Sequence, residues 1–350
     1  MSSALLKIRR PDDWHVHFRD GVALDTTVKP ISQVFGRVVA MPNLQPPITT
    51  TEEAINYRER LLSKSVDRLF SPWPSLYLTD STSFREINDF AASGFIAAKL
   101  YPAHATTNSS LGVSSIEKIE HILDEMARLG LVLQIHGEST DSCLDVFDRE
   151  EHFVHNVLDP LCQRHPSLKI VLEHVTTAVG VEFVRSAGSN VSATITPHHL
   201  DVERSSLFAG GMKPHLYCLP VPKTRKDREA LLGAAMGGET CFFLGSDSAP
   251  HRRSAKESGC CPAGVYCGHD TISYYADVFD RHGALDRLEA FSSEHGAEFY
   301  GFPLNEGYIL LQKGEYQVPN SIPYCGLDEL IPYRAGETLG WRVLCTGRLF

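Results

Sequence analysis

The chain has 350 residues, of which 43% are hydrophobic and 22% are charged, proportions that are ordinary for a globular protein. Its formal net charge of −10 and the lack of a Lys/Arg stripe argue against a nucleic-acid-binding surface. No apolar run approaches the roughly 18 residues that a membrane span needs, and no signal-peptide hydrophobic segment is evident near the N-terminus. Nine cysteines, an odd and scattered set, are typical of a reducing compartment. We therefore expect a cytoplasmic protein without membrane attachment.

The first predicted strand carries two histidines one residue apart. Side chains alternate between the faces of a strand, so His15 and His17 point to one side while Val16 and Phe18 pack on the other. Two imidazoles on one face can hold a divalent metal ion, and Arg19 continues that face with a guanidinium group suited to a carboxylate. A half-buried strand can also carry two histidines by chance. The interpretation therefore depends on the rest of the chain.

Further short apolar stretches of strand length follow at regular intervals. The predicted strands cover residues 12–18, 36–42, 75–79, 95–101, 131–136, 168–174, 191–196 and 241–246. Four of them end at or near a possible site residue, namely Lys99, His136, His174 and Asp247. The sequence spacing from Lys99 to His136 is nearly equal to that from His136 to His174. Both spacings are close to the length of one strand–helix unit of a (β/α)8 barrel, which averages about 30 residues. One such residue per unit is what a site at the barrel mouth requires.

Helical patterns lie between these strands. Amphipathic helices are predicted at residues 115–126, 223–236 and 271–279, from apolar residues at three- and four-residue spacing. Strand–helix alternation without a long linker predicts an α/β fold of the TIM (β/α)8 barrel type, and no Gly-x-Gly-x-x-Gly fingerprint supports a dinucleotide-binding sheet. We expect one hydrolase barrel domain over residues 1–350, with residues 306–350 as a C-terminal extension packed on it.

Four histidines, a lysine and an aspartate converge if the chain forms this barrel. The candidate ligands are His15, His17, Lys99, His136, His174 and Asp247. Six groups exceed what one tetrahedral zinc ion needs, so they favour two metal ions. The Lys99 ammonium has no lone pair, but its neutral amine can capture carbon dioxide as a carbamate whose two oxygens bridge two cations. Taken alone, a barrel lysine is more often paired with an acid, and the neighbouring histidine strands favour the carbamate.

These motifs resemble the amidohydrolase superfamily and, within it, the dihydroorotases of the single-function bacterial and fungal type. The resemblance covers most of the barrel, from the strand of His15 to the loop around Ala263. It implies two zinc ions per chain at the barrel mouth, bridged by N6-carboxylated Lys99 and by a hydroxide. It assigns His15, His17 and Asp247 to the more buried zinc ion, and His136 and His174 to the other.

The resemblance also implies the reaction, which interconverts L-dihydroorotate and N-carbamoyl-L-aspartate in pyrimidine biosynthesis, and a homodimeric enzyme. Asp247 would then be the catalytic proton acceptor. The matching substrate-binding residues are Arg19, Asn43 and His251 for the substrate carboxylate, Leu219 and Ala263 for the ring, and Thr106 and Thr107 at the tip of a mobile loop. Both dihydroorotate and N-carbamoyl-aspartate carry a carboxylate, which an arginine guanidinium group can bind through two parallel hydrogen bonds.

Two other functions remain open from the sequence. A hydantoinase-like cyclic amidohydrolase would share the metal ligands, but its substrate need not carry a ring carboxylate. A non-catalytic scaffold on the same fold would be expected to lack ligands, and this chain keeps all six. His198 and His199, which follow the strand at 191–196, are expected to lie behind the ligands or at the surface. Cys260, Cys261 and Cys267 lack paired Cys-x-x-Cys spacing, so no structural zinc is expected there.

Overall fold

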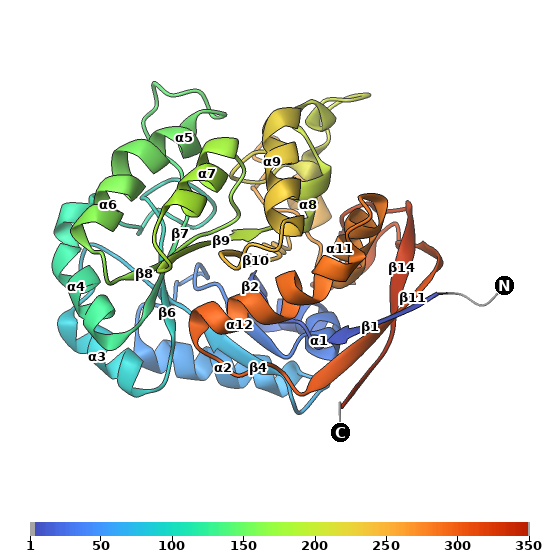
Figure 1. The fold of residues 1–350 in the computed structure, drawn as a ribbon, viewed down its shortest axis with the longest axis horizontal. Coiled ribbons are helices and arrows are strands. Elements are labelled where there is room, and N and C mark those ends of the chain that lie inside the picture. Colours follow the sequence, from blue (N-terminus) through green and yellow to red (C-terminus); the bar gives the residue numbers. More distant parts are fainter. Residues whose placement is uncertain (1–3, 349–350) are drawn as a thin grey trace.

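The computed structural model describes residues 4–348 and forms a barrel of parallel strands surrounded by helices (Figure 1). The barrel strands are β2 (Asp13–Val16), β3 (Arg37–Ala40), β4 (Ser71–Pro74), β5 (Leu76–Tyr77), β6 (Ala97–Leu100), β7 (Val132–Ile135), β8 (Lys169–Leu172), β9 (Val191–Ile195) and β10 (Phe242–Leu244). They pair in chain order, and β4 and β5 share one position that is interrupted at Ser75. The ring closes where the Asp247 amide donates to the His15 carbonyl oxygen at 2.9 Å. The predicted TIM (β/α)8 barrel is confirmed.

Most of the helices cover the outside of this barrel (Figure 1). They are α1 (Leu24–Val34), α2 (Thr51–Lys64), α3 (Phe84–Ala92), α4 (Glu120–Leu129), α5 (Arg149–Phe153), α6 (Asp159–Arg164), α7 (Ala178–Ser186), α8 (Pro197–Asp201), α9 (Arg225–Met236), α10 (Arg253–Lys256), α11 (Thr271–Arg281) and α12 (His295–Tyr300). The helix predicted from residue 115 begins at Glu120, after a 3₁₀ turn over Ile116–Lys118. Within residues 4–348, no helix is long and apolar enough to cross a bilayer.

The strands are buried on both faces, as expected for a parallel sheet covered by helices. Outward-facing residues such as Ala98 and Leu133 pack in the large core against the helices. Inward-facing Ala97 and Val132 belong to a separate core cluster inside the barrel, together with Trp14. Polar side chains at the carboxyl ends of the strands therefore lie above a packed apolar floor.

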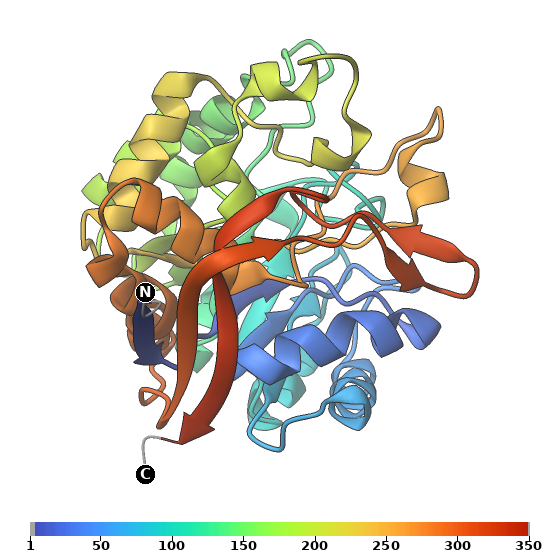
Figure 2. The same cartoon turned by 90° about the vertical axis from the view of Figure 1, so that its right-hand side faces the viewer.

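The C-terminal extension adds a second sheet at the side of the barrel (Figures 1 and 2). This sheet consists of β11 (Gly307–Gln317), β14 (Thr338–Arg348) and the N-terminal β1 (Leu5–Arg9), with β11 in the middle. Between β11 and β14 in the chain, β12 (Ile322–Tyr324) and β13 (Asp328–Leu330) form a separate two-stranded sheet. The three-stranded sheet contacts α11 and α1, and Tyr333 Oη donates to Asp201 Oδ2 at 3.0 Å. Strand β1 was missed by the sequence analysis because only Ile8 in it is buried, which leaves no continuous apolar run.

Candidate active site

Three of the predicted ligands converge at the ends of β2 and β10. The Nε2 atoms of His15 and His17 are 3.3 Å apart, and Asp247 Oδ1 lies 3.3 Å from the first and 3.1 Å from the second. Ligand atoms at about 2.0–2.1 Å from a tetrahedral zinc ion are separated by about 3.3 Å. The three atoms therefore have the spacing expected of ligands around one divalent metal ion.

Each of these histidines has an oxygen partner on its other ring nitrogen. His15 Nδ1 lies 2.9 Å from Glu173 Oε2, and His17 Nδ1 lies 2.9 Å from Asn43 Oδ1. Such partners favour a proton on Nδ1 and leave the Nε2 lone pair facing the centre of the group. Burial lowers the pKa of His17 to about 4, so the ring is neutral at pH 7, as a metal ligand must be.

A second pair of histidines lies beside the first group. His136 Nδ1 and His174 Nε2, after the ends of β7 and β8, are 3.2 Å apart. His136 Nε2 lies 2.7 Å from Glu138 Oε2, so Nδ1 is the nitrogen that faces His174. Burial, with a smaller contribution from His136, holds the pKa of His174 well below its usual value. The ring centroids of His15 and His174 are only 5.1 Å apart, which places the two histidine groups side by side.

Lys99 lies in β6 beneath these groups. Its side chain is fully buried, and its Nζ has no hydrogen-bond partner. Burial lowers the pKa of Lys99 to about 8, with the carboxylates of Glu173 and Asp247 opposing the shift. Its charge acts on both His15 and His174, one from each histidine group. A buried, unpartnered amine with a depressed pKa is the form that can react with carbon dioxide.

The carboxylate of Asp247 interacts electrostatically with histidines of both groups. Burial raises the pKa of its carboxyl, but the hydrogen bonds with His15 and His17 outweigh burial and hold that pKa well below its usual value. The carboxylate is therefore ionised at neutral pH, which is the form that a metal ligand or a proton acceptor requires.

Most of the sequence-predicted site residues line one small pocket. They are His15, His17, Arg19, Asn43, Thr106, Thr107, His136, His174, Leu219, Asp247 and Ala263, and Tyr101 and Gly264 line it as well. Lys99 is not among the lining residues. His251 does not line the pocket either, but its Nε2 lies 2.9 Å from Arg19 Nη2 and 2.9 Å from the Ala263 carbonyl oxygen. Burial, and then the charge of Arg19, lower the pKa of His251 to about 2, so this ring is neutral.

The backbone of three site residues is left-handed. Arg19, His174 and Asp247 have φ values of 64°, 42° and 45°. Non-glycine residues rarely adopt this conformation, and such strain is concentrated at functional sites. The prediction that Arg19 continues the strand face of the two histidines is therefore wrong, because β2 ends at Val16. The turn nevertheless directs Arg19 into the pocket, where its Nε donates to the Pro250 carbonyl oxygen at 3.0 Å.

The loop around Thr106 and Thr107 lies over the pocket. Asn43 Nδ2 donates to the Thr107 carbonyl oxygen at 3.0 Å, and Thr107 Oγ1 donates to the Ala263 carbonyl oxygen at 3.2 Å. Asn108 Nδ2 donates to the Asn43 carbonyl oxygen at 2.9 Å. The loop is thus attached to the site through polar contacts, which bound substrate can replace. That it moves between open and closed positions stays a prediction.

Replacing both Thr106 and Thr107 by glycine is expected to reduce kcat while the protein stays folded and metal-loaded. Two net hydrogen bonds of about 1 kcal/mol each correspond to roughly 30-fold. Steady-state kinetics and metal analysis of the purified variant measure both quantities. A Ser110→Gly variant in the same loop, at an exposed position, is the control. Unchanged turnover in the double variant would show that the loop is only a connection.

Sequence analysis missed the two carboxylates that orient the histidines. Glu138 and Glu173 are each 1% exposed, and each contacts one ligand histidine. Both stand within two positions of His136 or His174 in the sequence, and a buried acid beside a histidine was the available signal. The surface location considered for His198 and His199 is also wrong, because these residues are only 1% and 2% exposed.

Comparison with known proteins identifies the relatives of this chain. Residues 12–313 match the Amidohydrolase family. The dihydroorotase of Aromatoleum aromaticum is 52% identical over 97% of this chain and 99% of its own length. The dihydroorotase structures from Campylobacter jejuni and, with bound 5-fluoroorotic acid, Saccharomyces cerevisiae both superpose with a TM-score of 0.90. Their identities are 34% and 32%, over 98% and 97% of this chain and 98% of each neighbour.

The fold is shared more widely. An L-hydantoinase from Arthrobacter aurescens superposes with a TM-score of 0.82 over 98% of this chain and 84% of its own, at 17% identity, which reflects the barrel fold alone. The relatives and the convergent ligand groups together indicate a metal cofactor. The chain belongs to the amidohydrolase family and, within it, to the dihydroorotases.

Proposed function

We propose that this protein is a dihydroorotase that interconverts L-dihydroorotate and N-carbamoyl-L-aspartate in de novo pyrimidine biosynthesis. The observation that carries the proposal is the placement of Arg19, Asn43 and His251 around the pocket that contains the two histidine groups. This combination offers a carboxylate-binding fork beside a set of metal ligands. The high identity to dihydroorotases over nearly the full chain supports the same reaction.

We further propose that two zinc ions occupy the site. Ligand-atom separations of 3.1–3.3 Å in both histidine groups fit tetrahedral coordination, and the unpartnered Lys99 Nζ fits an N6-carboxylated lysine between them. His15, His17 and Asp247 would hold one ion, His136 and His174 the other, and carboxylated Lys99 both. When bound, such ions lower the pKa of a shared water towards neutrality and polarise the substrate carbonyl.

The protein groups then act on the substrate and its proton. Arg19 donates two N–H groups to the substrate carboxylate, and its contacts with Pro250 and His251 hold it in place. Water oxygen bonds to the ring carbonyl carbon, and Asp247 accepts the water proton. As the ring C–N bond breaks, Asp247 returns a proton to the departing nitrogen, so the carboxylate is regenerated. Leu219 and Ala263 line the wall against the ring.

The hydantoinase-like alternative is less well supported. The metal ligands suit both reactions, but a hydantoin or dihydrouracil ring offers no carboxylate to Arg19 and would leave this half-buried cation, which is partly shielded from solvent, without a partner anion. A non-catalytic scaffold would have no need for six intact candidate ligands.

Three further parts of the proposal concern the whole chain. We place the enzyme in the cytoplasm, in agreement with nine free cysteines. We treat residues 1–350 as one domain, because Val318 and Tyr333 of the extension pack in one cluster with Cys218 and Val265 of the barrel loops. A homodimer is proposed on the resemblance to dihydroorotases.

The proposed function is tested by comparing wild-type protein with an Arg19→Gln variant on dihydroorotate and on dihydrouracil, which lacks the carboxylate. Loss of a charged hydrogen bond worth about 1.5–3 kcal/mol is expected to raise KM for dihydroorotate roughly 10- to 100-fold, with metal content unchanged. Ring opening is followed by ultraviolet absorbance.

Arg60→Gln is the matched control, because Arg60 is an exposed arginine paired with Asp20. Equal wild-type activity on dihydrouracil and dihydroorotate would favour the hydantoinase-like alternative. An Arg19→Gln variant with an unchanged KM for dihydroorotate would contradict the assigned role of the guanidinium group.

A further inference from the structure

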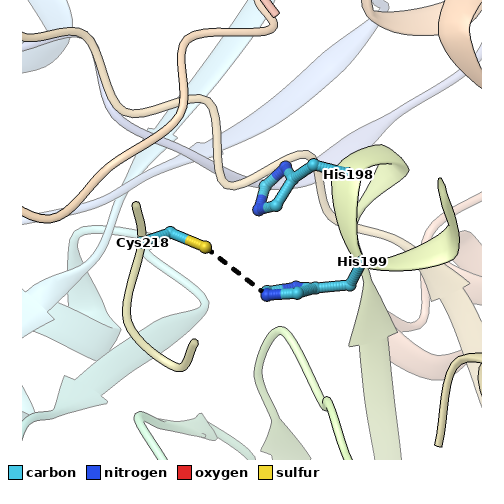
Figure 3. A group of neighbouring side chains, drawn as sticks. All are labelled: His198, His199 and Cys218. Carbon is cyan, nitrogen blue, oxygen red and sulfur yellow. Dashed lines mark hydrogen bonds between the residues drawn. The ribbon is translucent and has the colours of Figure 1, made fainter. Parts of the chain in front are cut away.

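Three possible metal ligands lie together outside the site described above. His198 and His199 belong to α8, directly after β9, and Cys218 comes from a later loop. Figure 3 shows both imidazole rings and the thiol facing a shared space between these two segments. Their ligand atoms lie within 4.8 Å of one another, and no residue of the three is more than 2% exposed. This cluster is as deeply buried as the predicted ligands of the pocket.

His198 is the unusual member because neither of its ring nitrogens has a hydrogen-bond partner. A neutral imidazole carries one N–H donor and one lone pair, and both are normally satisfied in a protein interior. In His199, by contrast, Nδ1 lies 2.9 Å from Thr196 Oγ1 and Nε2 lies 3.0 Å from the Pro220 carbonyl oxygen. His198 therefore has a buried nitrogen lone pair that no group of the protein uses and that a cation in the shared space can bind.

The spacing of the other two groups suits a zinc ion. Bonds of about 2.3 Å to sulfur and about 2.0–2.1 Å to nitrogen place tetrahedral ligand atoms about 3.6 Å apart. Cys218 Sγ lies 3.6 Å from His199 Nε2. If Nε2 binds a cation, the ring proton belongs on Nδ1, where Thr196 Oγ1 is placed to accept it. The Pro220 carbonyl oxygen, 3.4 Å from the same sulfur, adds a neutral donor beside the cluster.

We propose that His198, His199 and Cys218 form a third metal site, separate from the histidine groups of the pocket, for zinc or another borderline-soft divalent cation. Thiolate and imidazole ligands favour such ions over magnesium or calcium. The cation replaces the thiol proton of Cys218, which leaves to solvent. Because Cys218 precedes Leu219, which lines the pocket, an ion bound here would fix one wall of the substrate site.

Some charges near this cluster favour a bound cation and others disfavour it. The negative charge of Asp247 acts on all three residues and favours a cation there. Burial raises the pKa of the Cys218 thiol, and the positive charges of Lys256 and Lys223 lower it. The same two charges disfavour a cation bound at the cluster. A buried thiolate in this position is therefore stabilised best by a cation in direct contact with its sulfur.

Cobalt distinguishes this site from the pocket. A thiolate bound to Co(II) gives a near-ultraviolet charge-transfer band, and the proposed pocket ligands include no sulfur. Protein produced in cobalt-supplemented medium is expected to show this band and to contain three cobalt ions per chain. Cys218→Ser is expected to remove the band and one ion, and His198→Gln to lower occupancy of the same ion. Cys162→Ser, which changes a half-buried thiol in α6, should leave both quantities unchanged.

Folded wild-type protein with two cobalt ions and no thiolate band would overturn the proposal and would assign the His198 nitrogens to buried water. A band that persisted in Cys218→Ser and disappeared in Cys162→Ser would overturn it as well. The measurement does not depend on catalysis. Protein that showed the Cys218-dependent band but did not hydrolyse dihydroorotate would contradict the proposed function and support the third site.

Discussion

A Lys99→Ala variant is expected to lose one of the two pocket metals and nearly all dihydroorotase activity. The charge of Lys99 acts on a histidine of each group, and its Nζ is buried without a partner. Without a carboxylated lysine, the pair formed by His136 and His174 would keep two protein ligands, too few for a stable zinc site. Metal-assisted catalysis is worth several kcal/mol, so activity should fall on the order of 10³-fold or more.

Elemental analysis and kinetics of the variant measure these two losses separately. A short carboxylic acid that fits the space of the missing side chain is expected to restore part of both metal binding and activity. Lys169→Ala is the control, because Lys169 begins β8 at the opposite end of the barrel and donates to the Phe299 carbonyl oxygen. Full metal content in Lys99→Ala would exclude the bridging role, as would an unmodified amine in a metal-loaded crystal.

The barrel could be predicted because its signals are local and repeated. Each strand is a short apolar run buried on both faces, and the site residue at its end recurs at nearly constant spacing, as for Lys99, His136 and His174. Parallel strands in one ring place their carboxyl ends at one mouth, so the ligands could be grouped without knowledge of any distance. The guanidinium group of Arg19, two residues after His17, already indicated a carboxylate ligand, whereas the role of His251 came from the resemblance alone.

The remaining features depend on contacts that the chain order does not reveal. The left-handed turn that directs Arg19 inward is imposed by its surroundings, because the residue type itself disfavours that conformation. The pairing of β1 with β11 joins segments about 300 residues apart, and neither alternation nor an apolar run marks β1. Likewise, the proximity of Cys218 to His198 arises from the path of an irregular loop.

An Asp247→Asn variant is expected to lower kcat about 10²- to 10⁴-fold, the range typical for loss of a general acid–base group. Asparagine has nearly the same shape and keeps an oxygen that can face His15 and His17, but it cannot accept and return a proton at neutral pH. The substrate carboxylate is held by Arg19, which this change leaves in place, so KM should change less than kcat. The variant should therefore separate proton transfer from binding.

The comparison with Arg19→Gln makes this separation measurable. Asp247→Asn should lower kcat more than it changes KM, whereas Arg19→Gln should raise KM more than it changes kcat. Metal content decides how a loss of kcat is interpreted. Asp247 is a proposed ligand, so some loss of the adjacent metal is expected, and activity must be referred to the metal-loaded fraction after zinc is added back. If the loss of kcat disappeared after this correction, Asp247 would act only as a ligand. If Arg19→Gln lost metal to the same extent, the guanidinium group would support the ligand groups rather than the substrate.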